Sequence, residues 1–179
     1  MRIFSAFTWE DNFSNLLGCR VGATALKDMD RGYDDAVTAA FKEELDYLGV
    51  QSSTVSERAA EQVKGQWYTG HFIYVDTKRR HFDIGFDDGF VTPVVVPVAE
   101  CEGIDPADYP IPSLKTIREY GFEVSIEMAP VVQKQLLKCI YPNENTDMKR
   151  INPEKHFGII IQHIRKEAIE MYGPDYDIY

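Results

Sequence analysis

A long helix near the end of the chain is the feature that most constrains its fold. Asn152 is a residue type that favours the N-cap position, and Pro153 favours the first helical turn. The sequence EKHFGIIIQHIRKEAIEMY follows, and Gly173 with Pro174 then stops the pattern. We therefore predict a helix over about 153–172 that packs an apolar group into the core. This group consists of Ile159, Ile160, Ile161, Ile164 and Ala168, continued by Met171 and Tyr172.

Four shorter helices are predicted before it. Start and stop residues place them over about 34–48, 54–64, 114–120 and 130–141. In the first of these, Asp34 or Asp35 is the expected cap and Gly49 ends the helix. Its expected buried stripe has helical spacing and consists of Val37, Phe41, Leu45 and Leu48. The second helix opens with Thr54 and Glu57, which form the capping-box pattern.

Strand-like segments fill the middle of the chain. WYTGHFIYV (67–75), HFDIGF (81–86) and FVTPVVVPV (90–98) are rich in aromatic and β-branched residues, and polar turns separate them. This spacing predicts a three-stranded antiparallel meander. A further strand over about 122–128 alternates apolar and polar residues, so we expect it to bury Phe122, Val124, Ile126 and Met128.

The predicted fold class is therefore α+β. An antiparallel sheet, made of the meander at about 67–98 plus the strand at about 122–128, packs with about five helices. A chain of 179 residues is long enough for one sizeable core. We predict a single globular domain over 1–179.

The chain is acidic in both halves. It has 29 acidic and 19 basic residues, which gives a formal net charge of −10. Residues 1–90 hold 15 acids and 10 bases, and residues 91–179 hold 14 and 9. A negative surface repels phosphate backbones and anionic headgroups, so we expect neither nucleic acid nor a membrane as a partner. A basic protein would instead be attracted.

The three cysteines point to a reducing compartment. Cys19, Cys101 and Cys139 are far apart and form no C-x-x-C spacing, so we expect neither disulfides nor a zinc site. They are most simply small buried hydrophobic residues in a cytoplasmic protein. The chain meets Glu10 and Asp11 before a signal-peptide core forms, and no run approaches the roughly 20 apolar residues of a membrane span.

HFDIGFDDGF, residues 81–90, is the candidate metal-binding segment. In a strand, His81, Asp83 and Asp87 would share one face. His71, on the preceding strand, would add a fourth ligand. Imidazole and carboxylate groups of this kind bind divalent cations such as Mg²⁺ or Mn²⁺.

The register of the hairpin decides between a metal site and a structural role. A two-residue turn at 78–79 places His71 opposite Phe86, on the apolar face, whereas a slip of one residue places it opposite Asp87. The first register pairs apolar residues with each other and needs no metal, so it is the favoured interpretation. DDG (87–89) is then a turn in which Gly89 adopts a positive φ.

A second possible catalytic feature is VDTK (75–78), which resembles the Asp-x-Lys ending of the hairpin in restriction-type nucleases. That resemblance implies that Asp76 holds Mg²⁺, that Lys78 orients the attacking water, and that Glu57 or Glu61 adds an acid. It covers three residues, and a charged turn is the simpler explanation. The common nucleotide-binding, zinc-protease and serine-hydrolase motifs do not occur in the sequence.

Two functions follow as hypotheses. The first is an acidic protein-binding module that needs no cofactor and neutralises or regulates a basic partner, in the manner of an immunity protein, an antitoxin or a phage-encoded inhibitor. Its candidate binding residues are Asp35, Glu43, Glu44, Asp46, Glu123 and Glu127. The alternative is a hydrolase of a nucleotide or phosphodiester that uses Mg²⁺ or Mn²⁺, with His71, His81, Asp83 and Asp87 as ligands.

Overall fold

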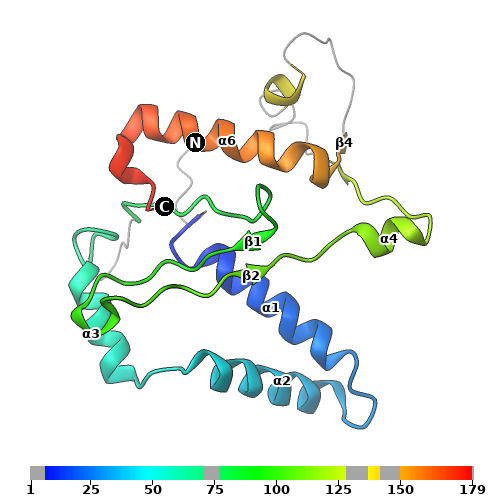
Figure 1. Ribbon diagram of the computed structural model, residues 1–179, viewed down its shortest axis with the longest axis horizontal. Coiled ribbons are helices and arrows are strands. Elements are labelled where there is room, and N and C mark those ends of the chain that lie inside the picture. Colours follow the sequence, from blue (N-terminus) through cyan, green and yellow to red (C-terminus); the bar gives the residue numbers. More distant parts are fainter. Residues whose placement is uncertain (1–6, 71–76, 128–136, 142–149, 179) are drawn as a thin grey trace. The chain divides into compact units, whose positions relative to one another are not determined.

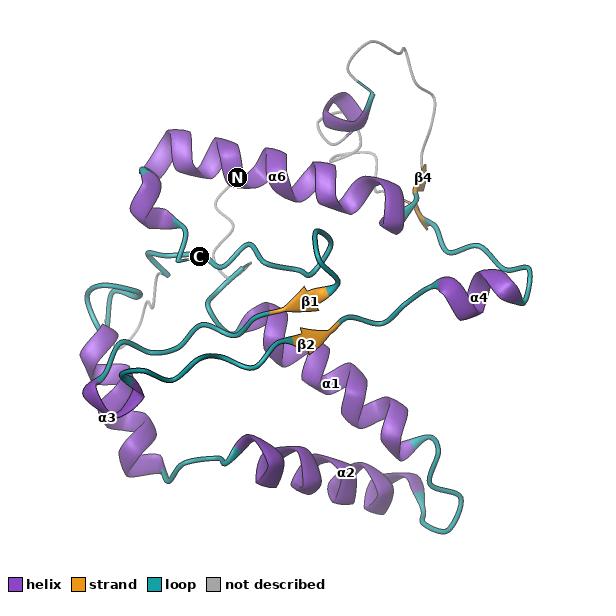
Figure 2. Cartoon of the chain, viewed as in Figure 1, coloured by secondary structure: helices purple, strands orange, loops and turns teal. Residues whose placement is uncertain are grey.

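A computed structural model of the chain describes residues 7–70, 77–127, 137–141 and 150–178. Its α-helices are α1 (Asp11–Ala25), α2 (Tyr33–Leu48), α3 (Ser53–Val63), α4 (Lys115–Glu119) and α6 (Pro153–Tyr172), and residues 137–140 are also helical (Figure 1). Its strands are β1 (Phe90–Val91), β2 (Tyr109–Pro110), β3 (Ile126–Glu127) and β4 (Arg150–Ile151). Short 3₁₀ turns occupy Ala99–Cys101 and Pro174–Tyr176. The α+β class is confirmed, with helix in the majority (Figure 2).

The chain divides into two compact units. The first unit consists of Met1–His81, Thr92–Asp108 and Ile178, and the second of Phe82–Val91, Tyr109–Asp177 and Tyr179. Among the described residues, no helix is both long and apolar enough to cross a membrane.

In the first unit, α1 packs against α2. The buried residues of the two helices are small or branched, namely Leu16, Val21 and Ala25 on α1 and Ala36 and Ala40 on α2. The predicted stripe on α2 is therefore only partly right, because Phe41 is 48% exposed. Alanine allows the two helix backbones to approach closely, so the alanine side of α2 faces α1. The sequence pattern missed α1 itself, since Gly18 and Gly22 weaken its helical signal.

Two helix starts of the first unit differ from the prediction. α2 begins at Tyr33 with Gly32 as its N-cap, so Asp34 and Asp35 lie in the first turn and do not cap the helix. α3 begins at Ser53 with Ser52 as its N-cap, and no side chain caps it. The predicted end of α2 is confirmed, because its C-cap Gly49 has the left-handed φ of 64°.

The second unit is organised by α6, whose predicted bounds and caps are confirmed. Asn152 Oδ1 accepts a hydrogen bond from the Lys155 amide at 3.2 Å, and Pro153 occupies the first turn. The buried cluster of this unit joins Leu137, Ile151 and Ile160, with Ile140, Tyr141, Phe157 and Ile164 packed against it. Three residues predicted in the core group are exposed instead: Ile159 by 46%, Met171 by 70% and Tyr172 by 61%.

The predicted sheet is wrong in its pairing. β1 pairs antiparallel with β2, Phe90 opposite Pro110, and β3 with β4, Ile126 opposite Ile151. Residues 81–86 form no strand. The expected buried face of the strand 122–128 is also wrong at Phe122, Val124 and Ile126, which are exposed, and Met128 lies outside the described residues.

A turn explains why 81–86 is not a strand. Gly85 has a φ of +72°, a left-handed conformation that breaks an extended run. Tyr68, from the first expected arm, bridges to Thr77 rather than to residues 81–86. His71, which was to decide the hairpin register, lies outside the described residues.

Candidate functional site

A high concentration of acidic residues lies between the end of α1 and the end of α2. We call residues 28–47 the acidic segment. It contains seven acidic residues and two basic ones, a net −5 that equals half of the −10 of the whole chain. Its acids are Asp28, Asp30, Asp34, Asp35, Glu43, Glu44 and Asp46, and its bases are Arg31 and Lys42. The comparison of sequence halves did not reveal this concentration.

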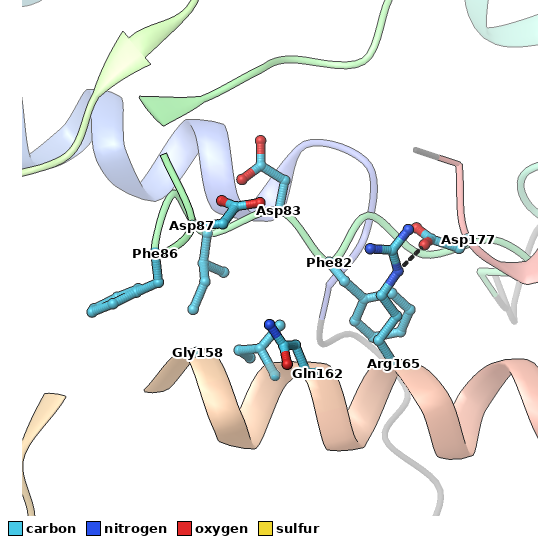
Figure 3. A pocket seen from close by; sticks show the side chains of 10 residues that line it. Phe82, Asp83, Phe86, Asp87, Gly158, Gln162, Arg165 and Asp177 are labelled. Atoms are coloured by element: carbon cyan, nitrogen blue, oxygen red, sulfur yellow. Dashed lines mark hydrogen bonds and ion pairs between the residues drawn. The ribbon is translucent and has the colours of Figure 1, made fainter. Parts of the chain in front are cut away.

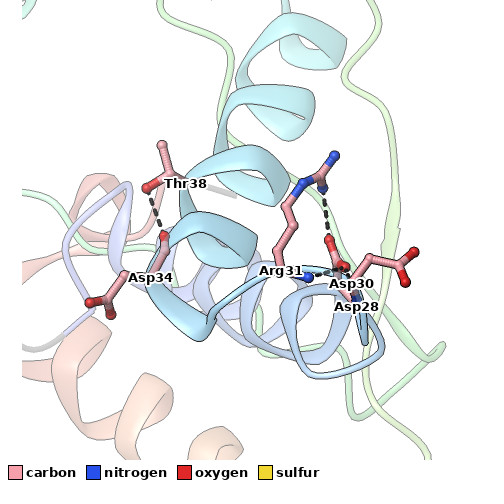
Figure 4. A network of polar contacts seen from close by, with 5 residues as sticks. All are labelled: Asp28, Asp30, Arg31, Asp34 and Thr38. Carbon is pink, nitrogen blue, oxygen red and sulfur yellow. Dashed lines mark hydrogen bonds and ion pairs between the residues drawn. The ribbon is translucent and has the colours of Figure 1, made fainter.

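The start of the acidic segment is a turn held by one aspartate (Figure 4). Asp28 Oδ1 accepts hydrogen bonds from the backbone amides of Asp30 and Arg31, at 3.1 and 3.2 Å. Asp28 Oδ2 binds the Arg31 guanidinium at 2.7 Å. This turn directs the chain from α1 into α2, and it neutralises one acid and one base against each other.

Two of the predicted binding residues are engaged in ion pairs. Glu44 binds Arg20 of α1 at 3.0 Å, and its side chain is only 14% exposed, so its expected place on the outer surface is wrong. The reason is that Glu44 follows Ala36 and Ala40 on the side of α2 that faces α1. Asp46 is exposed and pairs with Lys42, one turn before it.

The remaining carboxylates of the acidic segment face solvent. Asp30, Asp34, Asp35 and Glu43 are exposed, and within the described part of the chain none of them forms an ion pair. Large apolar and aromatic side chains lie among them, with Met29 90%, Tyr33 61%, Phe41 48% and Tyr47 71% exposed. The segment therefore combines unneutralised carboxylates with exposed aromatic rings.

Glu123 and Glu127 belong to the second unit, whereas the candidates on α2 belong to the first. Both are exposed, as predicted. Glu127 lies opposite Arg150 in the pairing of β3 with β4. The six predicted binding residues thus divide between the two units, and only Asp35 and Glu43 among them are exposed members of the acidic segment without a described ion pair.

The candidate metal ligands are part of a loop, not of one strand face. His81 is 2% exposed, and its backbone carbonyl accepts a hydrogen bond from Asn12 at 2.8 Å. Asp83 Oδ1 accepts from the Gly85 amide at 2.8 Å, and Asp87 Oδ1 from the Asp88 amide at 3.1 Å. His81 belongs to the first unit and the two aspartates to the second. Among the described residues, no three His, Cys, Asp or Glu side chains cluster in a way that could hold a metal ion.

The predicted turn at 87–89 is confirmed in its conformation. Gly89 has a φ of +92°, and its amide donates to the Gly85 carbonyl at 3.0 Å. Asp88 Oδ1 accepts from the Phe90 amide at 2.8 Å. Carboxylates of this loop therefore satisfy backbone amides that would otherwise lack partners in a tight turn.

Two of the nuclease-like residues, Lys78 and Glu61, are engaged elsewhere. Lys78 Nζ donates to the Gly65 carbonyl at 2.6 Å, and Glu61 pairs with Lys64 at 2.8 Å. Asp76 lies outside the described residues. The Lys78 side chain thus links its own segment to the residues that follow α3, so its ammonium group has a structural role.

A pocket lies between the loop 82–87 and α6, within the second unit. Its volume is about 120 Å³. Figure 3 shows Asp83 and Asp87 on the loop side and Gln162 and Arg165 on the helix side. Arg165 Nε binds the carboxylate of Asp177, whose side chain is 5% exposed. The remaining lining residues are Phe82, Ile84, Phe86, Gly158 and Ile161.

His156 lies in the first turns of α6 and makes local hydrogen bonds. Its Nδ1 accepts from the Asn152 amide at 3.1 Å, so the proton of the neutral ring is on Nε2, 3.2 Å from Tyr141 Oη. Partial burial, with a smaller contribution from Lys155, lowers the pKa of His156 below its usual range. Both ring nitrogens therefore serve the local structure.

The cysteines form no disulfide. Cys19 is exposed, which corrects the expectation that all three are buried, and Cys101 and Cys139 are half-buried. Burial raises the pKa of the Cys139 thiol, so the thiolate needed for nucleophilic chemistry is disfavoured there.

Comparison with known proteins finds one family. A family described as "Protein of unknown function (DUF4056)" matches residues 2–84. The match covers somewhat less than half of the chain and includes α1, α2, α3 and the whole acidic segment. No curated protein and no solved structure matches the chain.

Proposed function

We propose that this protein is a cytoplasmic binding module that neutralises or regulates a basic partner protein, in the manner of an immunity protein, an antitoxin or a phage-encoded inhibitor. The observation that carries this proposal is the acidic segment. Four of its carboxylates, those of Asp30, Asp34, Asp35 and Glu43, are exposed and have no ion-pair partner among the described residues. These charges are available to a cationic surface.

The aromatic residues of the same segment support binding to a protein. Tyr33, Phe41 and Tyr47 expose between 48% and 71% of their surface. Aromatic rings provide most of the energy at protein interfaces when a partner removes them from water, and surrounding carboxylates select a cationic partner and speed its approach. Carboxylates alone would increase the association rate of a partner but would contribute little to its affinity.

The negative charge also defines the class of partner. Nucleic acid and anionic membranes would be repelled by a segment of net −5 in a chain of net −10. A basic protein gains Coulomb energy at the same surface, and the interaction needs no metal or cofactor. The free cysteines fit a reducing cytoplasm.

The alternative is a hydrolase dependent on Mg²⁺ or Mn²⁺. We rank it second because Asp83 and Asp87 each direct an oxygen to a backbone amide of their own loop, and because Lys78 binds a backbone carbonyl. These contacts give the candidate catalytic groups a structural use. Addition and removal of the metal tests this alternative directly.

The binding proposal is tested by capture of partners from a lysate of the source cells on immobilised protein. The key variant replaces the four exposed carboxylates by their amides: Asp30→Asn, Asp34→Asn, Asp35→Asn and Glu43→Gln. We expect a basic protein to bind the wild type and to be lost from this variant. Mass spectrometry of the eluates measures both.

A matched control removes the same charge elsewhere. Glu57→Gln, Glu102→Gln, Asp105→Asn and Asp175→Asn also change four exposed carboxylates, none of which forms an ion pair among the described residues. The control should retain the partner. If the two variants lose it equally, net charge and not the acidic segment is responsible, and the proposal fails.

A further inference from the structure

Two glycines lie in the elements that form the pocket beside α6: Gly85 is in the loop, and Gly158 is among the lining residues on α6. A Cβ on Gly85 would lie 2.6 Å from Ile111 Cγ2 and 2.8 Å from the Phe90 carbonyl oxygen, so only glycine allows this turn. A Cβ on Gly158 would lie 3.9 Å from Phe86 Cβ, which is an ordinary contact. The absence of a side chain at Gly158 therefore leaves open space between the loop and the helix.

The walls of the pocket are apolar. Phe82, Ile84, Phe86 and Ile161 line it, and Phe86 makes an edge-to-face contact with Phe157 at a centroid distance of 5.4 Å. Its volume of about 120 Å³ is well below the roughly 300–1,000 Å³ of sites for drug-sized ligands. This size suits a single side chain.

The polar lining is negative. Asp83, Asp87 and Asp177 against Arg165 give a formal charge of −2 (three acids less one base), and Arg165 is bound to Asp177. Asp87 is the exposed carboxylate among them, and its Oδ1 accepts the Asp88 amide, which leaves its other oxygen for a ligand. An anion would be repelled here. A cation at the end of an aliphatic stem would match both the apolar walls and Asp87.

We propose that this pocket binds a lysine or arginine side chain of a protein partner. The methylene stem lies against Ile84, Phe86 and Ile161, and the cation reaches Asp87. Figure 3 shows Asp87 on the loop side of the pocket and Gln162 on the helix side. The inference rests on the proposed function, because it gives the basic partner a specific anchoring residue. It adds a second contact site, in the other compact unit from the acidic segment.

NMR titration tests the pocket without the partner. The probe is N-acetyl-lysine methylamide, and the matched control ligand is N-acetyl-norleucine methylamide, which has an aliphatic stem without the charge. We expect the lysine compound to shift the methyl signals of Ile84 and Ile161 in a saturable way. The norleucine compound should bind at least about fivefold more weakly, since it lacks the ion pair with Asp87.

Two variants test separately how the apolar walls and the charge of Asp87 contribute to lysine binding. Gly158→Met fills the pocket, whereas Gly158→Ala adds only a methyl group at ordinary contact distance and should still bind. Asp87→Asn removes the charge but keeps an oxygen that can accept the Asp88 amide. We expect Gly158→Met and Asp87→Asn each to weaken lysine binding at least about fivefold.

The outcomes are distinct from those of the capture experiment. Equal binding of the lysine and norleucine compounds, or full binding by Gly158→Met or Asp87→Asn, overturns the pocket inference. If Gly158→Met and Asp87→Asn bind the lysine compound as the wild type does, while the four-carboxylate variant loses its partner, the pocket inference fails and the proposed function stands. If the lysine compound binds as expected but capture does not depend on the acidic segment, the pocket binds cations and the proposed function fails.

Discussion

Carboxylates in two regions of this protein have opposite surroundings. In the acidic segment, Asp34 and Glu43 point their charge to solvent and bind no described cation. In the loop 82–90, Asp83, Asp87 and Asp88 each accept a backbone amide within one or two residues. The same residue type thus serves as a surface charge in one region and as a turn-forming group in the other.

The two kinds of carboxylate should affect different properties, namely association with a partner and stability of the fold. A solvated carboxylate contributes little to folding and remains available to a partner. A carboxylate that satisfies a turn amide contributes to folding, and its loss leaves a donor without its acceptor. Substitutions of Asp83 and Asp88 in the loop should therefore change the free energy of unfolding, and those in the acidic segment should change association.

The largest expected effect is that of Gly85→Ala. A left-handed φ disfavours alanine by about 1–2 kcal/mol, and the contacts with Ile111 and the Phe90 carbonyl add overpacking of about 1–3 kcal/mol. We expect a loss of about 3 kcal/mol in the free energy of unfolding, measured by urea titration. Gly89→Ala is the control, because it has a positive φ but no atom within 4 Å of the added Cβ. An equal loss in both variants would show that crowding at Gly85 is unimportant.

Asp83→Ala should have a smaller effect. It removes the acceptor of the Gly85 amide, so we expect about 1 kcal/mol of destabilisation, while Asp83→Asn keeps an acceptor and retains most of the stability. Glu43→Ala, in the exposed acidic segment, should remain within about 0.5 kcal/mol of wild type. Urea titration of the three variants decides the comparison. A larger loss in the free energy of unfolding for Glu43→Ala than for Asp83→Ala would contradict the assignment of the loop carboxylates to stability.

Mild acid should weaken the second unit through His156. Its folded pKa is lowered, so the unfolded chain binds the proton more readily once the pH falls below the unfolded pKa of about 6.5. Stability from this group is present above that pH and is lost as the pH falls towards the lower folded pKa. Thermal melting from pH 7.5 to pH 5 should show a steeper decline for wild type than for His156→Gln. If the melting temperature falls equally with pH in wild type and in His156→Gln, His156 is not the cause of the acid sensitivity.

The smallest expected effect is that of divalent metal. Because no three His, Cys, Asp or Glu side chains cluster among the described residues, we expect millimolar Mg²⁺ or Mn²⁺, compared with EDTA, to change the Tm by less than about 1 °C. Differential scanning fluorimetry measures this change. A Tm that rises steadily with metal concentration would favour the hydrolase alternative.

The sequence correctly predicted the elements for which capping residues, apolar spacing and stop residues all indicate the same structure. α6 has a favoured N-cap, a proline in its first turn, helical apolar spacing and a terminal glycine, and its bounds matched. The end of α2 at Gly49 and the positive φ of Gly89 were also found, since both depend on the special conformational freedom of glycine.

The pairing of strands could not be read in the same way. Phe90 pairs with Pro110 across the loop 92–108, and no local pattern identifies such a partner. Segment 81–86 has strand-forming residues, but Gly85 and the Asp83 turn override that propensity.

The candidate site was only partly predictable. The acidic character of α2 was evident, and Asp35 and Glu43 are exposed as expected. A count of acidic residues over a window of about 20 residues, the length of the acidic segment, would have found its concentration of carboxylates. The burial of Glu44 beside Arg20 depends on how α1 packs, and α1 itself had a weak signal. The pocket depends on the approach of a loop to Gly158, which tertiary structure alone determines.

The salt dependence of the association rate tests the central claim most directly. Surface plasmon resonance of the captured partner from about 50 mM to about 500 mM NaCl should show the wild-type rate falling at least about tenfold, as screening removes electrostatic steering. The variant lacking the four exposed carboxylates should have a much flatter dependence, and the matched control should resemble wild type. Equal salt dependence in the two variants would contradict a role for the acidic segment in attracting a basic partner.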